Sequence, residues 1–207
     1  MTADGDRIAL GFVETTLSLA VELTDAYTGG RPVEPIRVSL VDRDETFRRS
    51  PTGYHVLSDL PADVESVRIA VDAAAYLPEE RAVDLSTLDE LSPVESVTLL
   101  PAPNYDFGAG VSLVRGRVVD ADGAPVPNAT VTIDGRADET RCDHRGEFVL
   151  WFDDLERTEI RTTVENDRFV EVDGADPQVR AHRPDGSTAA ERLEVPLGST
   201  VSATVSF

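Results

Sequence analysis

The chain has 207 residues and a formal net charge of −20, and all 19 of its basic residues are arginine. Because phosphate binding needs a basic surface, this composition excludes nucleic acid as an expected partner. Cys142 is the single cysteine, which excludes an internal disulfide and gives no sign of an oxidising compartment.

The dense acidic charge without lysine indicates a protein that works in molar salt. There the Debye length falls to about 3 Å, so that neighbouring carboxylates no longer repel one another. We therefore expect a haloarchaeal source. The alternative is that the charge steers a basic partner toward the chain. The acidic residues are scattered through both halves rather than blocked into one tail, which favours the first interpretation.

The N-terminal part predicts no export signal. Residues 1–7 are expected to form a frayed or partner-docked leader, and alternating apolar positions over residues 8–25 predict one or two strands. Glu14 interrupts the only apolar stretch that could serve as a signal core, and no run is long enough to span a membrane. We expect a soluble chain, made in the cytoplasm, with no membrane insertion.

The rest of the sequence contains an internal repeat. A shift of 93 places residues 30–77 on residues 123–170 without a gap, and the identities fall on turn glycines and inward strand positions. The chain is therefore predicted to be a tandem duplication, with domains at 1–102 and 103–207. The identical pairs are Gly30/Gly123, Pro32/Pro125, Val33/Val126, Val38/Val131, Arg48/Arg141, Gly53/Gly146, Val56/Val149, Leu57/Leu150, Arg68/Arg161 and Val71/Val164.

Gly, Pro and Asp clusters mark chain reversals between alternating strands. The predicted turns are at 25–30, 51–54, 120–123 and 143–146. Residues 174–190 read as a long polar insertion that the first copy lacks. The remaining predicted elements are a helical turn within 85–91 and strands at 67–71, 96–100, 114–119, 130–133, 148–152, 160–164, 169–172, 193–197 and 201–207.

Residues 101–110 form the predicted linker, whose prolines make it semi-rigid. Tyr105 and Phe107 are large apolar groups within this connector. They are expected either to pack within the chain against a domain seam or to contact a partner protein.

The segment 116–152 combines turn residues with inward-facing apolar positions. They are Gly116, Val118, Asp120, Gly123, Pro125, Val126, Asn128, Ala129, Val131, Ile133, Asp143, Gly146, Phe148 and Leu150. In these residues the segment resembles the carboxypeptidase regulatory-like domain. The resemblance implies an immunoglobulin- or transthyretin-like β-sandwich, usually non-catalytic and often an accessory or assembly module. With the repeat, it predicts an all-β chain of two tandem sandwiches.

A second resemblance concerns residues 100–107 followed by 113–118, which look like the junction in small tandem-sandwich proteins found with phage-tail-like contractile injection systems. It implies a structural subunit of such a particle, at its cap, baseplate or an adaptor ring. The implied partners are other protein subunits, with a homo-oligomeric ring as one arrangement, and the particle would be released from the cell. A ligand-binding accessory module, for calcium or carbohydrate, is the alternative.

The sequence contains two candidate metal sites. His144 and Glu147 match H-x-x-E, the zinc half-site of metallocarboxypeptidases, but the only later histidine is His182, inside the polar segment. A zinc hydrolase is thus a remote alternative. Asp120 and Asp122 could begin a calcium loop, yet a hairpin turn explains the same residues.

The remaining candidates are single motifs. Cys142 beside His144 lacks the spacing of a closed zinc site, and the sequon at 128–130 is interpreted as turn chemistry in a chain without export. We expect no catalytic residues, no metal ligands and no cofactor, and hence a protein that is not an enzyme.

Overall fold

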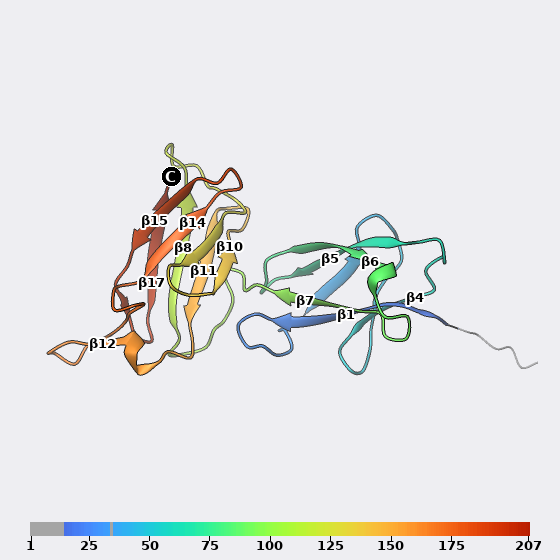
Figure 1. Cartoon of the computed structure of the whole chain (residues 1–207), viewed down its shortest axis with the longest axis horizontal. Coiled ribbons are helices and arrows are strands. Elements are labelled where there is room, and N and C mark those ends of the chain that lie inside the picture. Colours follow the sequence, from blue (N-terminus) through green and yellow to red (C-terminus); the bar gives the residue numbers. More distant parts are fainter. Residues whose placement is uncertain (1–14, 34) are drawn as a thin grey trace, which may run out of the picture. The chain divides into compact units, whose positions relative to one another are not determined.

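A computed structural model describes residues 15–33 and 35–207. Within these residues almost all regular structure is β-strand, and helix is limited to two 3-10 turns, η1 (Leu85–Thr87) and η2 (Arg157–Glu159). No helix in this part of the chain has the length and apolar character that a membrane span requires. The predicted all-β class is confirmed, and η1 lies in the predicted helical turn (Figure 1).

The strands follow the alternating segments of the sequence. The predicted leader at 1–7 and the first residues of the predicted strand at 8–25 lie outside the described residues. The strands before the linker are β1 (Leu17–Asp25), β2 (Ile36–Leu40), β3 (Arg48–Arg49), β4 (His55–Ser58), β5 (Ser66–Ala73), β6 (Glu79–Asp84) and β7 (Val94–Leu99). Those after it are β8 (Ser112–Val119), β9 (Thr130–Ile133), β10 (Glu139–Arg141), β11 (Glu147–Phe152), β12 (Ile160–Thr162), β13 (Arg168–Val170), β14 (Gln178–His182), β15 (Thr188–Arg192), β16 (Val195–Pro196) and β17 (Thr200–Ser206).

The chain divides into two compact units, and each unit is built from segments that are not consecutive in the sequence. Among the described residues, unit 1 contains residues 15–22 together with Val38–Ala70 and Glu80–Val97, and unit 2 contains residues 23–33 and 35–37 together with Val71–Glu79 and Thr98–Phe207. A single cut at the linker does not describe this packing. The domains at 1–102 and 103–207 remain a prediction about the duplication.

The sheets on either side of the linker have related strand orders. Before the linker the sheets are β3-β4-β1-β7 and β2-β5-β6, and after it they are β11-β8-β17 and β10-β9-β14-β15, with a small extra sheet β12-β13-β16. The order β4-β1-β7 therefore corresponds to β11-β8-β17, and β2-β5-β6 to β9-β14-β15. This correspondence is what a duplicated sandwich would give, and the duplication remains our proposal.

The predicted polar insertion at 174–190 is wrong. It contains β14 and β15, and β14 pairs with β9 so that Val179 lies opposite Ile133 and Ala181 opposite Val131. Val179 and Ala181 are fully buried. The sequence of β14 looks polar because only these two small side chains face inward. The residues that alternate with them, Gln178, Arg180 and His182, are only partly buried.

The gap-free alignment of the two halves also fails beyond Phe152. It equates Val71 with Val164, yet Val71 is 2% exposed and Val164 is 104% exposed, in the turn after β12. The strand that corresponds to β5 is β14. β5 pairs with β2 and β14 pairs with β9, and β2 and β9 hold the same position in the two related strand orders. The segment that the first half lacks is therefore 153–177, with η2, β12 and β13.

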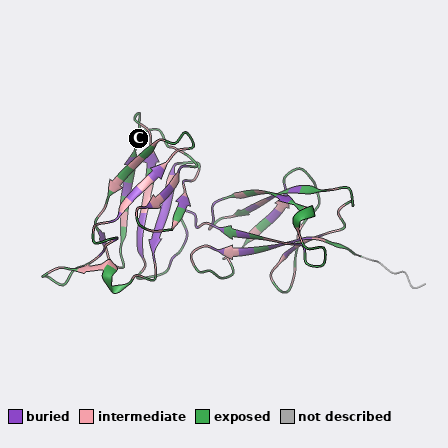
Figure 2. Ribbon diagram, viewed as in Figure 1, coloured by how far each residue is buried: buried purple, intermediate pink, exposed green. Residues whose placement is uncertain are grey.

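Buried residues concentrate on the strands (Figure 2). In unit 2, β8 runs between β11, to which it is antiparallel, and β17, to which it is parallel. Gly116 on β8 leaves room for Phe148 of β11, because a Cβ at position 116 would lie 2.4 Å from the Phe148 ring. The resemblance residues Gly116 and Phe148 thus belong to one packing contact.

We predict that Gly146→Ala destabilises the protein more than Gly123→Ala does. Both glycines close Asp-x-x-Gly turns with positive φ, at 74° and 79°, and an alanine in this region costs about 1–2 kcal/mol of strain. A Cβ at position 146 would also lie 2.7 Å from the Val118 carbonyl oxygen, whereas position 123 has open space. Urea unfolding monitored by circular dichroism measures both changes. Equal losses in the free energy of unfolding would contradict the close approach at Gly146.

Candidate functional site

The most highly organised polar group in unit 2 is the carboxylate of Asp25, which is 1% exposed. Asp25 ends β1, where the chain must reverse, and its Oδ1 accepts hydrogen bonds from the backbone N–H groups of Tyr27 (2.7 Å) and Thr28 (3.2 Å). Its own N–H donates to the carbonyl of Gly30 at 2.9 Å. The local sequence therefore places the carboxylate through an Asx turn.

The second carboxylate oxygen binds two tyrosines from distant segments. Asp25 Oδ2 accepts from the hydroxyl of Tyr76 at 2.7 Å and from the hydroxyl of Tyr105 at 2.6 Å. Both rings are buried, with 3% and 4% of their surface exposed. Four donors thus satisfy one buried carboxylate, as burial of a polar group requires.

Burial also fixes the protonation of these donors. Desolvation, followed by the hydrogen bond to Asp25, raises the pKa of Tyr76 to about 12, and the same causes raise the pKa of Tyr105 further. Both hydroxyls therefore keep their protons at neutral pH and remain donors. The arrangement suits a fixed structural contact.

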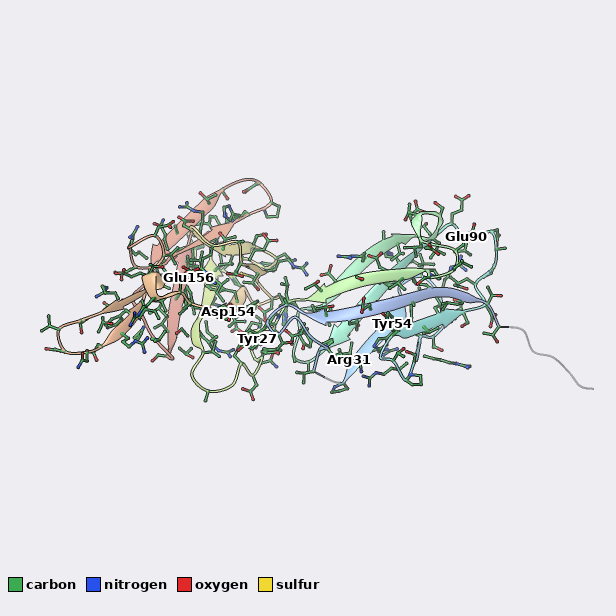
Figure 3. The ribbon with its side chains drawn as sticks, turned by 60° about the horizontal axis from the view of Figure 1, so that its bottom comes forward. Tyr27, Arg31, Tyr54, Glu90, Asp154 and Glu156 are labelled. Atoms are coloured by element: carbon green, nitrogen blue, oxygen red, sulfur yellow. The ribbon has the colours of Figure 1, made fainter. Side chains whose placement is uncertain are left out.

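Aromatic rings pack around this carboxylate. Tyr27, from the loop between β1 and β2 (Figure 3), lies 4.9 Å from Phe107 and 5.9 Å from Trp151 of β11, measured between ring centroids. Tyr105 lies 5.6 Å from Tyr76 and 4.7 Å from Phe107. Such edge-on and tilted contacts add about 0.5–1.5 kcal/mol per pair beyond area burial.

The linker backbone is held within unit 2 as well. Arg115 donates to the carbonyl of Tyr105 at 2.8 Å, and its guanidinium lies 5.7 Å from the centre of the Phe107 ring. The N–H of Ala102 donates to the carbonyl of Ala75 at 2.9 Å. We call Asp25, Tyr27, Tyr76, Tyr105, Phe107 and Trp151 the linker clamp.

The predicted pair Tyr105 and Phe107 belongs to this clamp. Both side chains lie inside unit 2, since they are 4% and 6% exposed, so intramolecular packing accounts for them. Partner binding by the pair remains a prediction, and it would require the clamp to open. Sequence reasoning missed Asp25 and Tyr76 as their companions, because they lie 80 and 29 positions before Tyr105 and share no motif with it.

In the turn that was weighed as a calcium loop, Asp120 binds backbone N–H groups of the turn itself. Asp120 Oδ1 accepts from the N–H groups of Asp122 (3.0 Å) and Ala124 (2.9 Å). Asp143 does the same for Arg145 (2.8 Å) and Glu147 (2.9 Å). These carboxylates hold hairpin turns, which is the interpretation that competed with calcium binding.

The residues of the zinc hypothesis are spread over different elements. His144 lies in the turn before β11, while His182 lies on β14 with its Nε2 3.5 Å from the Thr132 hydroxyl. Among the described residues no three His, Cys, Asp or Glu side chains gather as metal ligands would. Cys142 is 2% exposed, and burial raises its thiol pKa to about 12, which opposes formation of a nucleophilic thiolate.

Comparison with known proteins finds a family match in the second half of the chain. Residues 113–206 match the family model of the Carboxypeptidase regulatory-like domain, which confirms the resemblance found in the sequence. No curated protein matches the chain significantly. The match is confined to these residues and leaves the first half unassigned.

Three solved structures are similar to the chain, with low TM-scores and low sequence identity. They are the TIE protein of Bacillus anthracis (TM-score 0.29, 12% identity, 92% of this chain and 34% of that chain), a streptococcal ancillary pilin (0.28, 10%, 93% and 62%) and BcpA, the major pilin subunit of Bacillus cereus (0.26, 12%, 74% and 43%). The chain spans less than two thirds of each of these structures. Similarity at this level carries no functional argument.

We predict that Tyr105→Phe lowers the free energy of unfolding by about 1–3 kcal/mol, because Asp25 Oδ2 then loses one of its two buried donors. Tyr54→Phe is the matched control, since its hydroxyl contacts Glu22 at an exposed site, 3.3 Å away. That change should cost no more than about 0.5 kcal/mol. Urea denaturation of both variants in the same salt makes the comparison. A Tyr105→Phe protein as stable as the control would show that the clamp contributes little.

Proposed function

We propose that the chain is a non-enzymatic structural subunit of a larger protein assembly. The observation that carries the proposal is the linker clamp, in which a buried carboxylate and five aromatic rings serve to fix the linker within unit 2. A subunit that presents a set surface to its neighbours needs such a segment to be held in place on its own unit. The match of residues 113–206 to a family whose members are usually non-catalytic supports the same role.

The side chains best suited to chemistry have structural partners. Asp25 holds two tyrosines, Asp120 and Asp143 hold turns, and Cys142 is packed in the core of unit 2. Each group is thus already bound in a contact that catalysis or ligand binding would have to break. This favours a structural role over the ligand-binding module, and over a zinc hydrolase still more.

We further propose that the assembly is a phage-tail-like contractile injection particle of a halophilic archaeon. Two features support the finer proposal: the resemblance of residues 100–107 and 113–118 to the junction of tandem-sandwich proteins from such particles, and the acidic, lysine-free composition. On this proposal the chain assembles with other subunits in the cytoplasm and leaves the cell with the particle.

The particle proposal predicts copurification. The full chain with an affinity tag, expressed in a haloarchaeal host that makes such particles and purified without lowering the salt, should bring down tube, sheath or baseplate subunits and sediment with a large complex. Mass spectrometry of the eluate identifies them, and cells that express the tag alone provide the control. Recovery of the chain as a small species without these subunits would overturn the particle proposal.

The halophilic proposal predicts unfolding in dilute buffer. With a net charge of −20, removing salt extends the Debye length from about 3 Å at 1 M to about 30 Å at 0.01 M, and carboxylate repulsion then destabilises the compact state. Circular dichroism should show loss of the β signal on dialysis and its return when molar KCl is restored. An unchanged signal and an unchanged melting temperature in dilute buffer would contradict a halophilic origin.

A further inference from the structure

Strand β17 lies beside β8 (Figure 1) and ends its sheet in the described part of the chain. The N–H of Leu113 donates to the carbonyl of Ser199 at 2.9 Å, and the N–H of Phe207 donates to the carbonyl of Val119 at 3.0 Å. Odd-numbered residues of this stretch therefore direct their backbone groups toward β8. Because the direction alternates along a strand, the even-numbered residues within 200–206 direct theirs away from it. The outer side of β17 is thus a row of backbone groups that another strand could satisfy.

This outer side has little protection. The side chain of Glu191, on β15, accepts a hydrogen bond from the N–H of Thr204 at 2.9 Å. Natural proteins protect sheet edges with charged side chains, prolines or β-bulges. The sequence of β17 contains no charged residue and no proline, and its register with β8 runs without a bulge. Glu191 is a single side chain that an incoming strand can displace.

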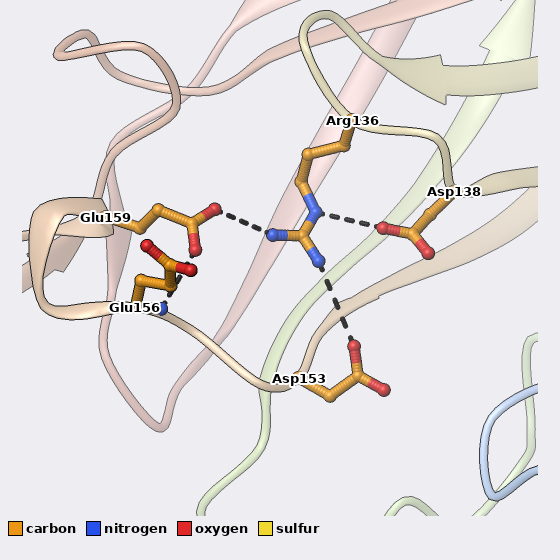
Figure 4. Close-up of polar contacts among 5 residues, drawn as sticks. All are labelled: Arg136, Asp138, Asp153, Glu156 and Glu159. Atoms are coloured by element: carbon orange, nitrogen blue, oxygen red, sulfur yellow. Dashed lines mark hydrogen bonds and ion pairs between the residues drawn. The ribbon is translucent and has the colours of Figure 1, made fainter.

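The lack of charge around β17 is unusual for this chain. Residues 195–207 contain no charged side chain, although 28% of the chain is charged. Elsewhere in unit 2, ion pairs tie exposed segments to one another. Examples are the pairs of Arg136 with Asp138 (2.9 Å), Glu159 (2.9 Å) and Asp153 (3.9 Å), drawn in Figure 4, and those of Arg161 with Glu171 (2.9 Å) and Asp176 (3.0 Å).

The corresponding strand of the first half is protected. In the order β4-β1-β7, strand β7 holds the place that β17 holds in β11-β8-β17. A terminal nitrogen of Arg81, on β6, lies 2.8 Å from the carboxylate of Glu95 on β7 and donates to the carbonyl of Ser96 at 2.8 Å. An ion pair thus covers a backbone acceptor of β7. A strand in this place can carry charge, so the fold does not require β17 to be uncharged.

We infer that β17 of one copy pairs with β17 of a second copy of the chain. The two strands run antiparallel about a two-fold axis, and the sheet continues through both copies in the order β11-β8-β17-β17-β8-β11. Each strand brings the backbone donors and acceptors that the other lacks. The inference deepens the proposed function, on which it rests, by naming one partner and the surface that binds it.

Charge favours a second copy over an unrelated partner. Two chains with a net charge of −20 repel each other, so copies can meet closely only where the contact itself is uncharged, as β17 is. A different partner of so acidic a chain would best be basic, and β17 offers no carboxylate to bind it. The exposed side chains of β17 are all Thr or Ser, which form favourable cross-strand pairs with one another.

The contact is isologous, so it closes at the dimer. Two strands of seven residues make a small interface, and we therefore expect weak association that depends on protein concentration. Molar salt should strengthen it, because screening weakens the repulsion between the two acidic chains.

Sedimentation equilibrium of the full chain in molar KCl tests the inference. Wild-type protein should dimerise as its concentration rises, whereas Ser202→Pro should stay monomeric, because proline has no N–H and its ring occupies the outer side of the strand. Ser96→Pro is the matched control and should dimerise like the wild type. Ser96 precedes buried Val97 on β7 as Ser202 precedes buried Ala203 on β17. Melting curves check that both variants fold.

Glu191→Ala should have the opposite effect. It frees the N–H of Thr204 and removes a carboxylate beside the edge, so the variant should dimerise with a dissociation constant at least about fivefold smaller than that of the wild type. A dissociation constant equal to or larger than the wild-type value would show that association does not use this edge.

Hydrogen exchange locates the contact. The amides of Ser202 and Ser206 face away from β8, so they should exchange fast in dilute protein and slowly at concentrations that populate the dimer. The amides of β7 should exchange at the same rate under both conditions. A monomeric wild-type protein, a folded Ser202→Pro protein that dimerises normally, or a dimer without new protection on β17 would each overturn the inference.

The two proposals fail in different ways. If the chain is a particle subunit without this contact, wild-type protein is monomeric alone but still copurifies with the other subunits. If it is not a particle subunit, copurification fails whatever the sedimentation result.

Discussion

The structure of unit 2 depends on satisfying one buried carboxylate. A buried carboxyl group without hydrogen bonds costs several kcal/mol or more. Asp25 avoids this cost with donors from its own loop, from Tyr76 and from Tyr105. Displacing any of these segments would leave the buried carboxylate with fewer hydrogen-bond donors. The clamp therefore makes the placement of three distant segments cooperative, and the linker is part of the folded unit rather than a flexible connector.

Carboxylates serve the same purpose at the reversals of the second half. Asp120 and Asp143 each accept two backbone N–H groups ahead of a glycine with positive φ. In an acidic chain, aspartate thus supplies both surface charge and the internal hydrogen bonds that fix its turns. A sequence motif that contains Asp and Gly is consequently weak evidence for a metal site in this protein.

Sequence reasoning succeeded where the structural signal is local. Alternation and turn residues predicted β8, β9 and β11 nearly to their ends, because each pattern is read within a few positions. It failed at β14, whose inward residues, Val179 and Ala181, are too small and too few to stand out. It could not find the clamp, since Asp25 and Tyr105 meet through the tertiary fold, and no local pattern records a contact over 80 positions.

Residues 153–177 show which contacts hold an added segment on a sandwich of this kind. Exposed ion pairs contribute about 0–1 kcal/mol each, and the first half keeps the same strand order without any equivalent of residues 153–177. The ion pairs of Arg161 therefore add little to the stability of unit 2. Val170 and Val172 of the same segment are buried in the hydrophobic core, so apolar burial rather than surface charge holds the segment in place.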